Sequence, residues 1–111
     1  MKVKDLAVAL NMKVVQPAGE DGDIAAGYTS DLLSDVMANA KDGCALITIQ
    51  AHVNTVAVAA LTGVSAVIIC NDRPIPDDMV TAAERESIPI LQTDKNQFTT
   101  SYLVYTKINN T

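Results

Sequence analysis

A chain of 111 residues, 49% of them hydrophobic, can bury one core but not two, so we expect a single domain over residues 1–111. The net charge of −5 and the scattered Lys and Arg residues argue against binding to nucleic acid or to anionic membranes, because both depend on clustered positive charge. The sequence shows neither a signal peptide nor an apolar run near the roughly 20 residues that span a bilayer, so we expect a cytoplasmic protein.

The first 23 residues predict a helix, a strand and a loop. The apolar side chains that recur at helical spacing are Val3, Leu6, Ala7 and Leu10. Asn11 is suited to the left-handed residue that ends such a helix, and residues 12–15 turn extended. Residues 16–23 hold a proline and two glycines among acidic residues, which predicts a surface loop or hairpin.

A second strand and helix are expected before position 43. Residues 24–27 form a short candidate strand. Thr29 or Ser30 is a candidate N-cap for the helix that follows, and Asp31 lies favourably near the positive end of that helix. The apolar stripe of the helix consists of Leu32, Leu33, Val36, Met37 and Ala40.

Residues 44–74 have the pattern of a strand–helix–strand unit. A strand from Cys44, an apolar helix over residues 53–61, a glycine stop at Gly63 and a strand that ends near Cys70 follow one another. A right-handed crossover brings the polar turns after both strands to the same edge of the sheet. The helix is apolar on nearly every face, which predicts a second cover besides the sheet, and a partner subunit could provide it.

The last third of the chain predicts two helices around a short strand. A helix with an acidic first turn is expected over Asp77–Glu86, and a buried strand over residues 88–91. Asp94 and Gln97 resemble a capping box for a last helix, although residues 100–108 could instead form a strand. The aromatic residues at helical spacing there, which suit core or interface better than base stacking, are Phe98, Tyr102 and Tyr105.

Together these elements predict an α/β fold with a mostly parallel central sheet flanked by helices. Within it the two cysteines are expected to be unpaired and buried. Cys44 begins one strand and Cys70 ends its parallel neighbour, nearly 20 Å away, whereas a disulfide needs Cα atoms within about 7 Å. One histidine cannot complete a metal site with them, so no metal is expected.

Polar turns follow the strands of this sheet, at residues 28–30, 50–54, 71–73 and 92–94. Helix N-termini at such an edge offer free N–H groups to an anion. The candidate ligand-binding residues are Gln50, His52, Asn54, Asn71, Arg73 and Thr93.

Each of the two basic candidates also has a structural interpretation. His52 can cap the helix that follows it or contact a ligand. Arg73 can bind a ligand or pair with Asp72 or Asp94. The chain offers no nucleophile–base pair, so no catalytic residue is expected.

Four segments of the chain form a recognisable pattern: Gly27-Tyr28-x-x-Asp31-Leu-Leu-Ser34, Thr48-x-Gln50-x-His52-x-Asn54-x-x-Ala57, Ala83-x-x-x-x-Ile88-Pro89-Ile90 and Thr93-Asp94. In this pattern the chain resembles the DRTGG domain family, and most of all its small stand-alone members, over nearly its whole length. The resemblance implies an α/β domain, usually dimeric, that regulates an attached enzyme and in some cases binds adenine nucleotides. Some relatives are called kinase-like, but the chain contains no P-loop of the form GxxxxGK[ST].

The sequence departs from the motif that names the family. Gln50-Ala51-His52 stands in place of Gly-Asp-Arg, and Cys70-Asn71-Asp72 in place of Thr-Gly-Gly. The carboxylate of Asp72 would repel a phosphate, and Arg73 beside it would compensate in part.

Two functions fit these observations. The first is a non-catalytic, homodimeric regulatory or sensing module that binds a small anionic ligand such as an adenine nucleotide, with no other cofactor. The second is an adaptor domain that docks a partner enzyme through its apolar helix and its Tyr-bearing C-terminus, with no small ligand. A hydrolase or kinase has no supporting residues.

Overall fold

The computed structural model describes residues 1–17, 19–20 and 22–109, which form five helices and five strands. The helices are α1 (Val3–Ala9), α2 (Leu33–Asn39), α3 (Val53–Thr62), α4 (Asp77–Glu86) and α5 (Gln97–Asn109). The strands are β1 (Lys13–Gln16), β2 (Ala26–Thr29), β3 (Cys44–Thr48), β4 (Ala66–Ile69) and β5 (Ile90–Gln92). The expected loop over residues 16–23 includes positions 18 and 21, which lie outside the described residues.

The strands form one sheet in the order β1-β5-β4-β3-β2. β2, β3, β4 and β5 are parallel to one another, and only the edge strand β1 is antiparallel, to β5. The predicted α/β fold with a mostly parallel sheet is confirmed, as is the central unit of β3, α3 and β4. Asn11 and Gly63 take the left-handed conformation expected of helix-ending residues, with φ of 54° and 72°.

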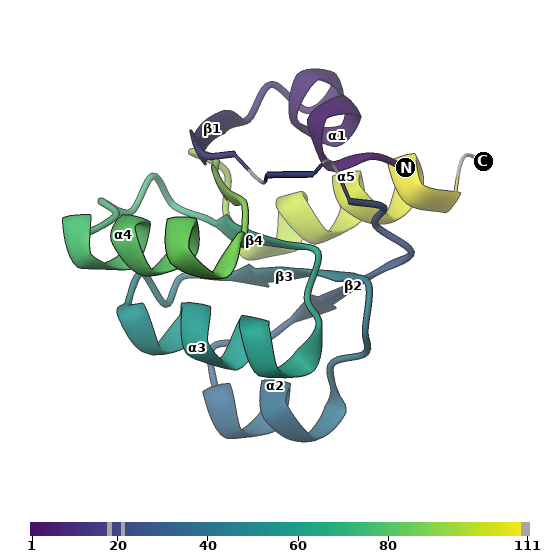
Figure 1. The fold of residues 1–111 in the computed structure, drawn as a ribbon. Helices are drawn as coiled ribbons and strands as arrows, with labels where there is room; N and C mark the ends of the chain where they lie inside the picture. Colours follow the sequence, from purple (N-terminus) through teal and green to yellow (C-terminus); the bar gives the residue numbers. More distant parts are fainter. Residues whose placement is uncertain (18, 21, 110–111) are drawn as a thin grey trace.

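Helices cover both faces of the sheet (Figure 1): α1 and α5 on one side, and α2, α3 and α4 on the other. Every residue of β3 and β4 is buried, as expected for strands covered on both faces. α3 packs against both α2 and α4, so the second cover that its apolar sequence predicts comes from the same chain. Leu61 near its end is 75% exposed.

Two strands begin two residues later than predicted. Strand β2 starts at Ala26 because the residues before it face the N-terminal segment: Asp23 bridges to Lys2, and the Ile24 N–H donates to the Met1 carbonyl at 2.7 Å. Strand β5 starts at Ile90 because Pro89 has no N–H for the ladder, although its carbonyl accepts from the Val67 N–H at 3.0 Å.

The start of α2 differs from the sequence expectation. Leu32 occupies the N-cap position and gives no side-chain cap, while the Ser30 hydroxyl accepts the Leu32 N–H at 3.2 Å. Val36 alone of the predicted stripe is fully buried, whereas Leu32 and Met37 are exposed.

The C-terminal segment is helical, so the alternative strand over residues 100–108 is wrong. The predicted capping box is also wrong: the Asn96 side-chain oxygen accepts the Thr99 N–H at 2.9 Å, while Asp94 pairs with Lys95 at 3.7 Å. The aromatic side chains do not join the core, since the exposed fractions are 85% for Phe98, 64% for Tyr102 and 67% for Tyr105.

Both cysteines are free and buried, as predicted. Cys44 lies at the start of β3 and Cys70 just after β4, and burial raises the pKa of both thiols. Among the described residues, no helix has the length and apolar character that crossing a bilayer requires.

Candidate functional site

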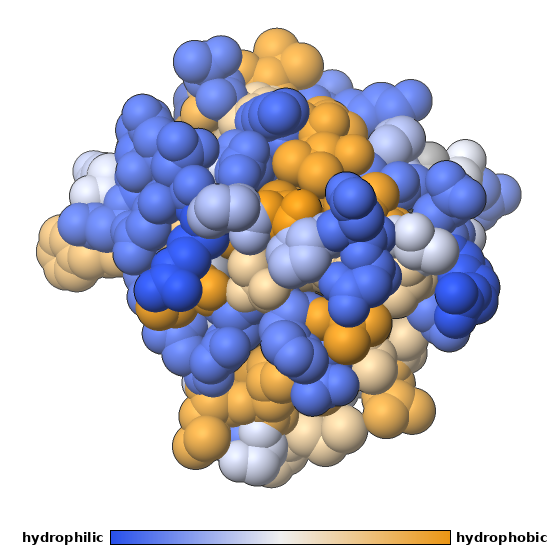
Figure 2. Space-filling view, turned by 90° about the vertical axis from the view of Figure 1, so that its left-hand side faces the viewer, coloured by the Kyte–Doolittle hydropathy of each residue, from blue (hydrophilic) through white to orange (hydrophobic). Residues whose placement is uncertain are grey.

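The turns after the four parallel strands all meet at one side of the sheet, as predicted. We call this side the carboxyl edge; it consists of residues 30–32, 49–52, 70–73 and 93–96. Helices α3 and α4 both begin there, on the left in Figure 1. Figure 2 looks directly onto this side and shows a largely hydrophilic surface interrupted by apolar areas.

Asp31 organises the part of the carboxyl edge that follows β3. Its Oδ1 accepts the Thr48 hydroxyl at 2.8 Å, the Ile49 N–H at 2.9 Å and the Gln97 amide at 2.9 Å. The sequence suggested only an interaction with the dipole of α2. One carboxylate oxygen therefore satisfies three donors at the end of β3.

Gln50 belongs to the same network as Asp31. Its side-chain amide donates to the Asp31 carbonyl at 3.0 Å, and its N–H donates to the Thr48 hydroxyl at 3.1 Å. Its carbonyl accepts the Thr55 hydroxyl at 2.7 Å. Gln50 therefore fixes the loop between β3 and α3.

His52 is the N-cap of α3, as one of its two sequence interpretations predicted. Its Nδ1 accepts the Asn54 N–H at 3.1 Å, which requires an unprotonated Nδ1 and leaves the proton on Nε2. The His52 ring and the Asn54 side chain are both exposed. The ring therefore presents an Nε2 donor while its other nitrogen holds the start of the helix.

The turn after β4 is built on two left-handed residues, Asn71 and Asp72, with φ of 61° and 52°. Asn and Asp tolerate this conformation better than most side chains. The Asn71 N–H donates to the Lys95 carbonyl and the Asp72 N–H to the Thr93 carbonyl, both at 2.9 Å. These amides are therefore occupied by the turn after β5.

Arg73 is the exposed cation of this turn. Its N–H donates to the Cys70 carbonyl at 3.3 Å, and its carbonyl accepts the Gln92 side-chain amide at 2.8 Å. Within residues 1–17, 19–20 and 22–109 its guanidinium forms no ion pair, so the alternative of a bridge to Asp72 or Asp94 is wrong there. The backbone is fixed while the charged group is available.

Thr93 contributes to the scaffold. It is 5% exposed, and its hydroxyl oxygen accepts the Lys95 N–H at 3.3 Å. The six candidate residues thus fall into two neighbouring groups, one around the loop after β3 and one around the paired turns after β4 and β5.

A polar cluster on the α2 side of the sheet has shifted pKa values. The Tyr28 hydroxyl donates to Asp35 Oδ2 at 2.8 Å, and the Asn39 amide donates to Asp35 Oδ1 at 2.9 Å. The bond from Tyr28 lowers the pKa of Asp35 below 3.8, and the carboxylate raises the pKa of Tyr28 above 10.0.

These shifts predict how Tyr28→Phe changes the pH dependence of stability. The Asp35 contribution is present above its unfolded pKa and is lost as pH falls through its lower folded pKa. The Tyr28 contribution is present below pH 10.0 and is lost as pH rises through its higher folded pKa. The stability difference between wild type and variant, from urea unfolding across pH, should be constant near neutrality and shrink at both extremes. A difference that grows in acid or alkali would contradict this.

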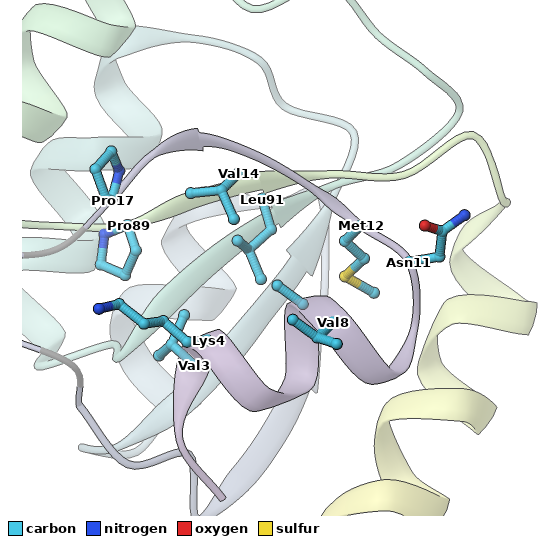
Figure 3. Close-up of a pocket in the computed structure, with 10 residues that line it drawn as sticks. Val3, Lys4, Val8, Asn11, Met12, Val14, Pro17, Pro89 and Leu91 are labelled. Carbon is cyan, nitrogen blue, oxygen red and sulfur yellow. The ribbon is translucent and has the colours of Figure 1, made fainter.

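Two hollows lie away from the carboxyl edge. One of about 540 Å³ opens between α1 and β1, where Val3, Val8, Val14 and Leu91 surround it (Figure 3). The other, of about 310 Å³, lies between β2 and α5. Neither contains any of the six candidate residues.

The fold is that of an α/β domain whose four parallel strands end at one polar edge. The family model of the DRTGG domain matches residues 24–106, and the chain therefore belongs to the DRTGG domain family. A comparison with curated protein sequences found no match.

A solved structure with the same fold is that of the CBS and DRTGG domains of the regulatory region of Clostridium perfringens pyrophosphatase, complexed with the activator diadenosine tetraphosphate. The TM-score is 0.75 at 15% sequence identity. The match covers 92% of this chain and 45% of that one, so the present chain spans less than half of the matched structure.

Proposed function

We propose that this protein is a non-catalytic regulatory or sensing module that binds a small anionic ligand, such as an adenine nucleotide, at the carboxyl edge. The observation that carries this proposal is Arg73, an exposed guanidinium on a fixed turn with no ion pair among the described residues. An exposed guanidinium of this kind can make charge-assisted hydrogen bonds to a phosphate.

The geometry also favours one part of the edge over the other. The Asp31 carboxylate already holds the donors at the end of β3, so it would repel a phosphate there. The phosphate would therefore bind at the turns after β4 and β5, where the Arg73 guanidinium offsets part of the repulsion from the Asp72 carboxylate. His52 and Asn54, exposed at the start of α3, are placed to contact the remainder of the ligand.

The comparisons support a regulatory role. DRTGG domains occur in the regulatory region of the matched pyrophosphatase, which was solved with an adenine-containing polyphosphate activator. By analogy with that regulatory region, we propose that this chain has no catalytic activity and binds no metal. It also includes a cytoplasmic location, a single domain over residues 1–111 and a homodimer, all predicted from the sequence.

The proposal is tested by calorimetric titration of the full chain with AMP, ATP and diadenosine tetraphosphate, and with inorganic phosphate as the comparison. We expect saturable heat for at least one adenine compound and weaker binding of phosphate alone. Binding at a hundred times the dissociation constant should also add about 2.7 kcal/mol of stability. The absence of heat and of thermal stabilisation at millimolar concentrations of all four would overturn nucleotide binding.

A second candidate function, docking of a partner enzyme, is favoured by a different observation. The side chains of Phe98, Tyr102 and Tyr105 are exposed along one side of α5, and aromatic side chains are enriched in protein interfaces. If the titrations show no ligand and the chain is monomeric, so that this side of α5 is free, an adaptor role is the better interpretation of this chain.

A further inference from the structure

The two edge strands of the sheet are β1 and β2 (Figure 1), and only one of them has features that prevent pairing with another chain. At the β1 edge, Lys13 adds a charge, the pairing is irregular between Val14 and Gln16, and Pro17 follows the strand. Charges, irregular pairing and proline are the usual features that keep an edge strand from adding a neighbour.

The β2 edge has none of these features. Its residues Ala26–Thr29 carry no charge and no proline, and they pair with β3 in regular register. Three of the four are exposed, and no described strand pairs with the outer side of β2. The N–H and C=O groups on that side are therefore available to another strand.

Helix α5 continues this uncharged surface beside β2. The Thr29 and Ser101 hydroxyls lie 2.7 Å apart, and Tyr105 lines the hollow of about 310 Å³ together with Ala26 and Gly27. We define the β2–α5 surface by Ala26, Gly27, Thr29, Phe98, Tyr102 and Tyr105. Because none of these side chains is charged, two copies can meet there without like-charge repulsion, although the chain has a net charge of −5.

The area available also suits a dimer. At about 150–250 Å² for each ring, weighted by exposure, the three aromatic side chains supply roughly 300–550 Å². A stable interface takes about 800 Å² from each partner. The outer side of β2 and the walls of the hollow add to the aromatic area, so this surface can meet most of the requirement.

We propose that the β2–α5 surface binds a second copy of this chain, with the two β2 strands antiparallel across a two-fold axis. The two sheets would then join into one of ten strands. Such an axis brings the same surface of both copies together, so the α5 rings of each copy pack against the β2 edge and hollow of the other. This inference rests on the proposed homodimer and gives its interface.

Sedimentation velocity of the full chain at micromolar concentrations tests the inference. We expect wild type to have twice the chain mass. Ala26→Lys and Tyr102→Asp, both at exposed positions, should each raise the dimer dissociation constant about a hundredfold or more, because a two-fold axis introduces each charge twice. Circular dichroism and thermal melting should show that both variants remain folded.

Leu61→Asp is the matched control, since Leu61 is an equally exposed apolar side chain on α3. It should remain dimeric. If both surface variants remain dimeric, or if Leu61→Asp loses the dimer instead, the interface lies elsewhere. Either result would overturn this inference while leaving the homodimer in place. A monomeric wild type would overturn both the homodimer and this interface. Ligand binding would still be tested separately by the nucleotide titrations.

Discussion

Replacing Asp31 with Ala should destabilise the protein by about 2–3 kcal/mol, a large effect for a side chain outside the core. The substitution leaves the Thr48 hydroxyl, which is fully buried, and the Ile49 N–H without their acceptor, and it also releases Gln97 of α5. Hydrogen bonds to a charged group contribute more than neutral ones, and their buried donors are costly to leave unpaired. Urea unfolding should show a lower midpoint with an unchanged slope.

Two control variants distinguish the contribution of the Asp31 hydrogen bonds to stability from the effect of removing a negative charge. Asp31→Asn keeps an oxygen at the position that accepts all three bonds, so we expect a smaller loss of about 1 kcal/mol. Asp94→Ala removes an exposed carboxylate that pairs with the exposed Lys95, and should change stability by less than about 0.5 kcal/mol. Asp31→Ala with near wild-type stability would mean that the network does not hold the edge together.

Arg73→Ala should weaken binding of an adenine nucleotide about ten- to a hundredfold, because it removes a charge-assisted hydrogen bond of about 1.5–3 kcal/mol. The fold should be unaffected, since the bonds to Cys70 and Gln92 use only the backbone of Arg73. Calorimetric titration of wild type and variant measures the ratio.

The matched control is Arg85→Ala. Arg85 is the other arginine of the chain and lies exposed in the last turn of α4, away from the carboxyl edge. The affinity of this variant should equal that of wild type. If Arg73→Ala binds the nucleotide as tightly as wild type does, the ligand site is elsewhere on the molecule.

The parts of the fold that the sequence predicted well are those in which one physical signal dominates. The apolar runs of β3 and β4, with Gly63 between them, admit only a buried parallel unit. Boundaries failed where a distant segment competed, as when Ile24 bonded to Met1 and left β2 to begin at Ala26. The capping box predicted at Asp94 and Gln97 was wrong because the Asn96 side chain, closer to the first turn of α5, accepts the Thr99 N–H instead.

The sequence predicted that the turns carrying the candidate residues meet at one edge of the sheet, but it missed the role of Asp31 there. Asp31 is 17 residues from Thr48 and 66 from Gln97 along the chain, so no local pattern joins them. A polar Thr48 at the end of an otherwise apolar strand was the available signal that an acceptor was needed there. His52 was easier to interpret, because a cap acts over only two residues.

The most direct test of ligand binding at the carboxyl edge is ¹H–¹⁵N NMR of the full chain titrated with AMP. The prediction is that the amide signals of Asn71, Asp72 and Arg73 shift most, with smaller shifts at His52 and Asn54 and little change in α1 and β1. A nucleotide site at this edge would be contradicted if the shifts were concentrated around the hollow between α1 and β1. It would also be contradicted if millimolar AMP caused no shifts and the protein bound none of the other adenine compounds.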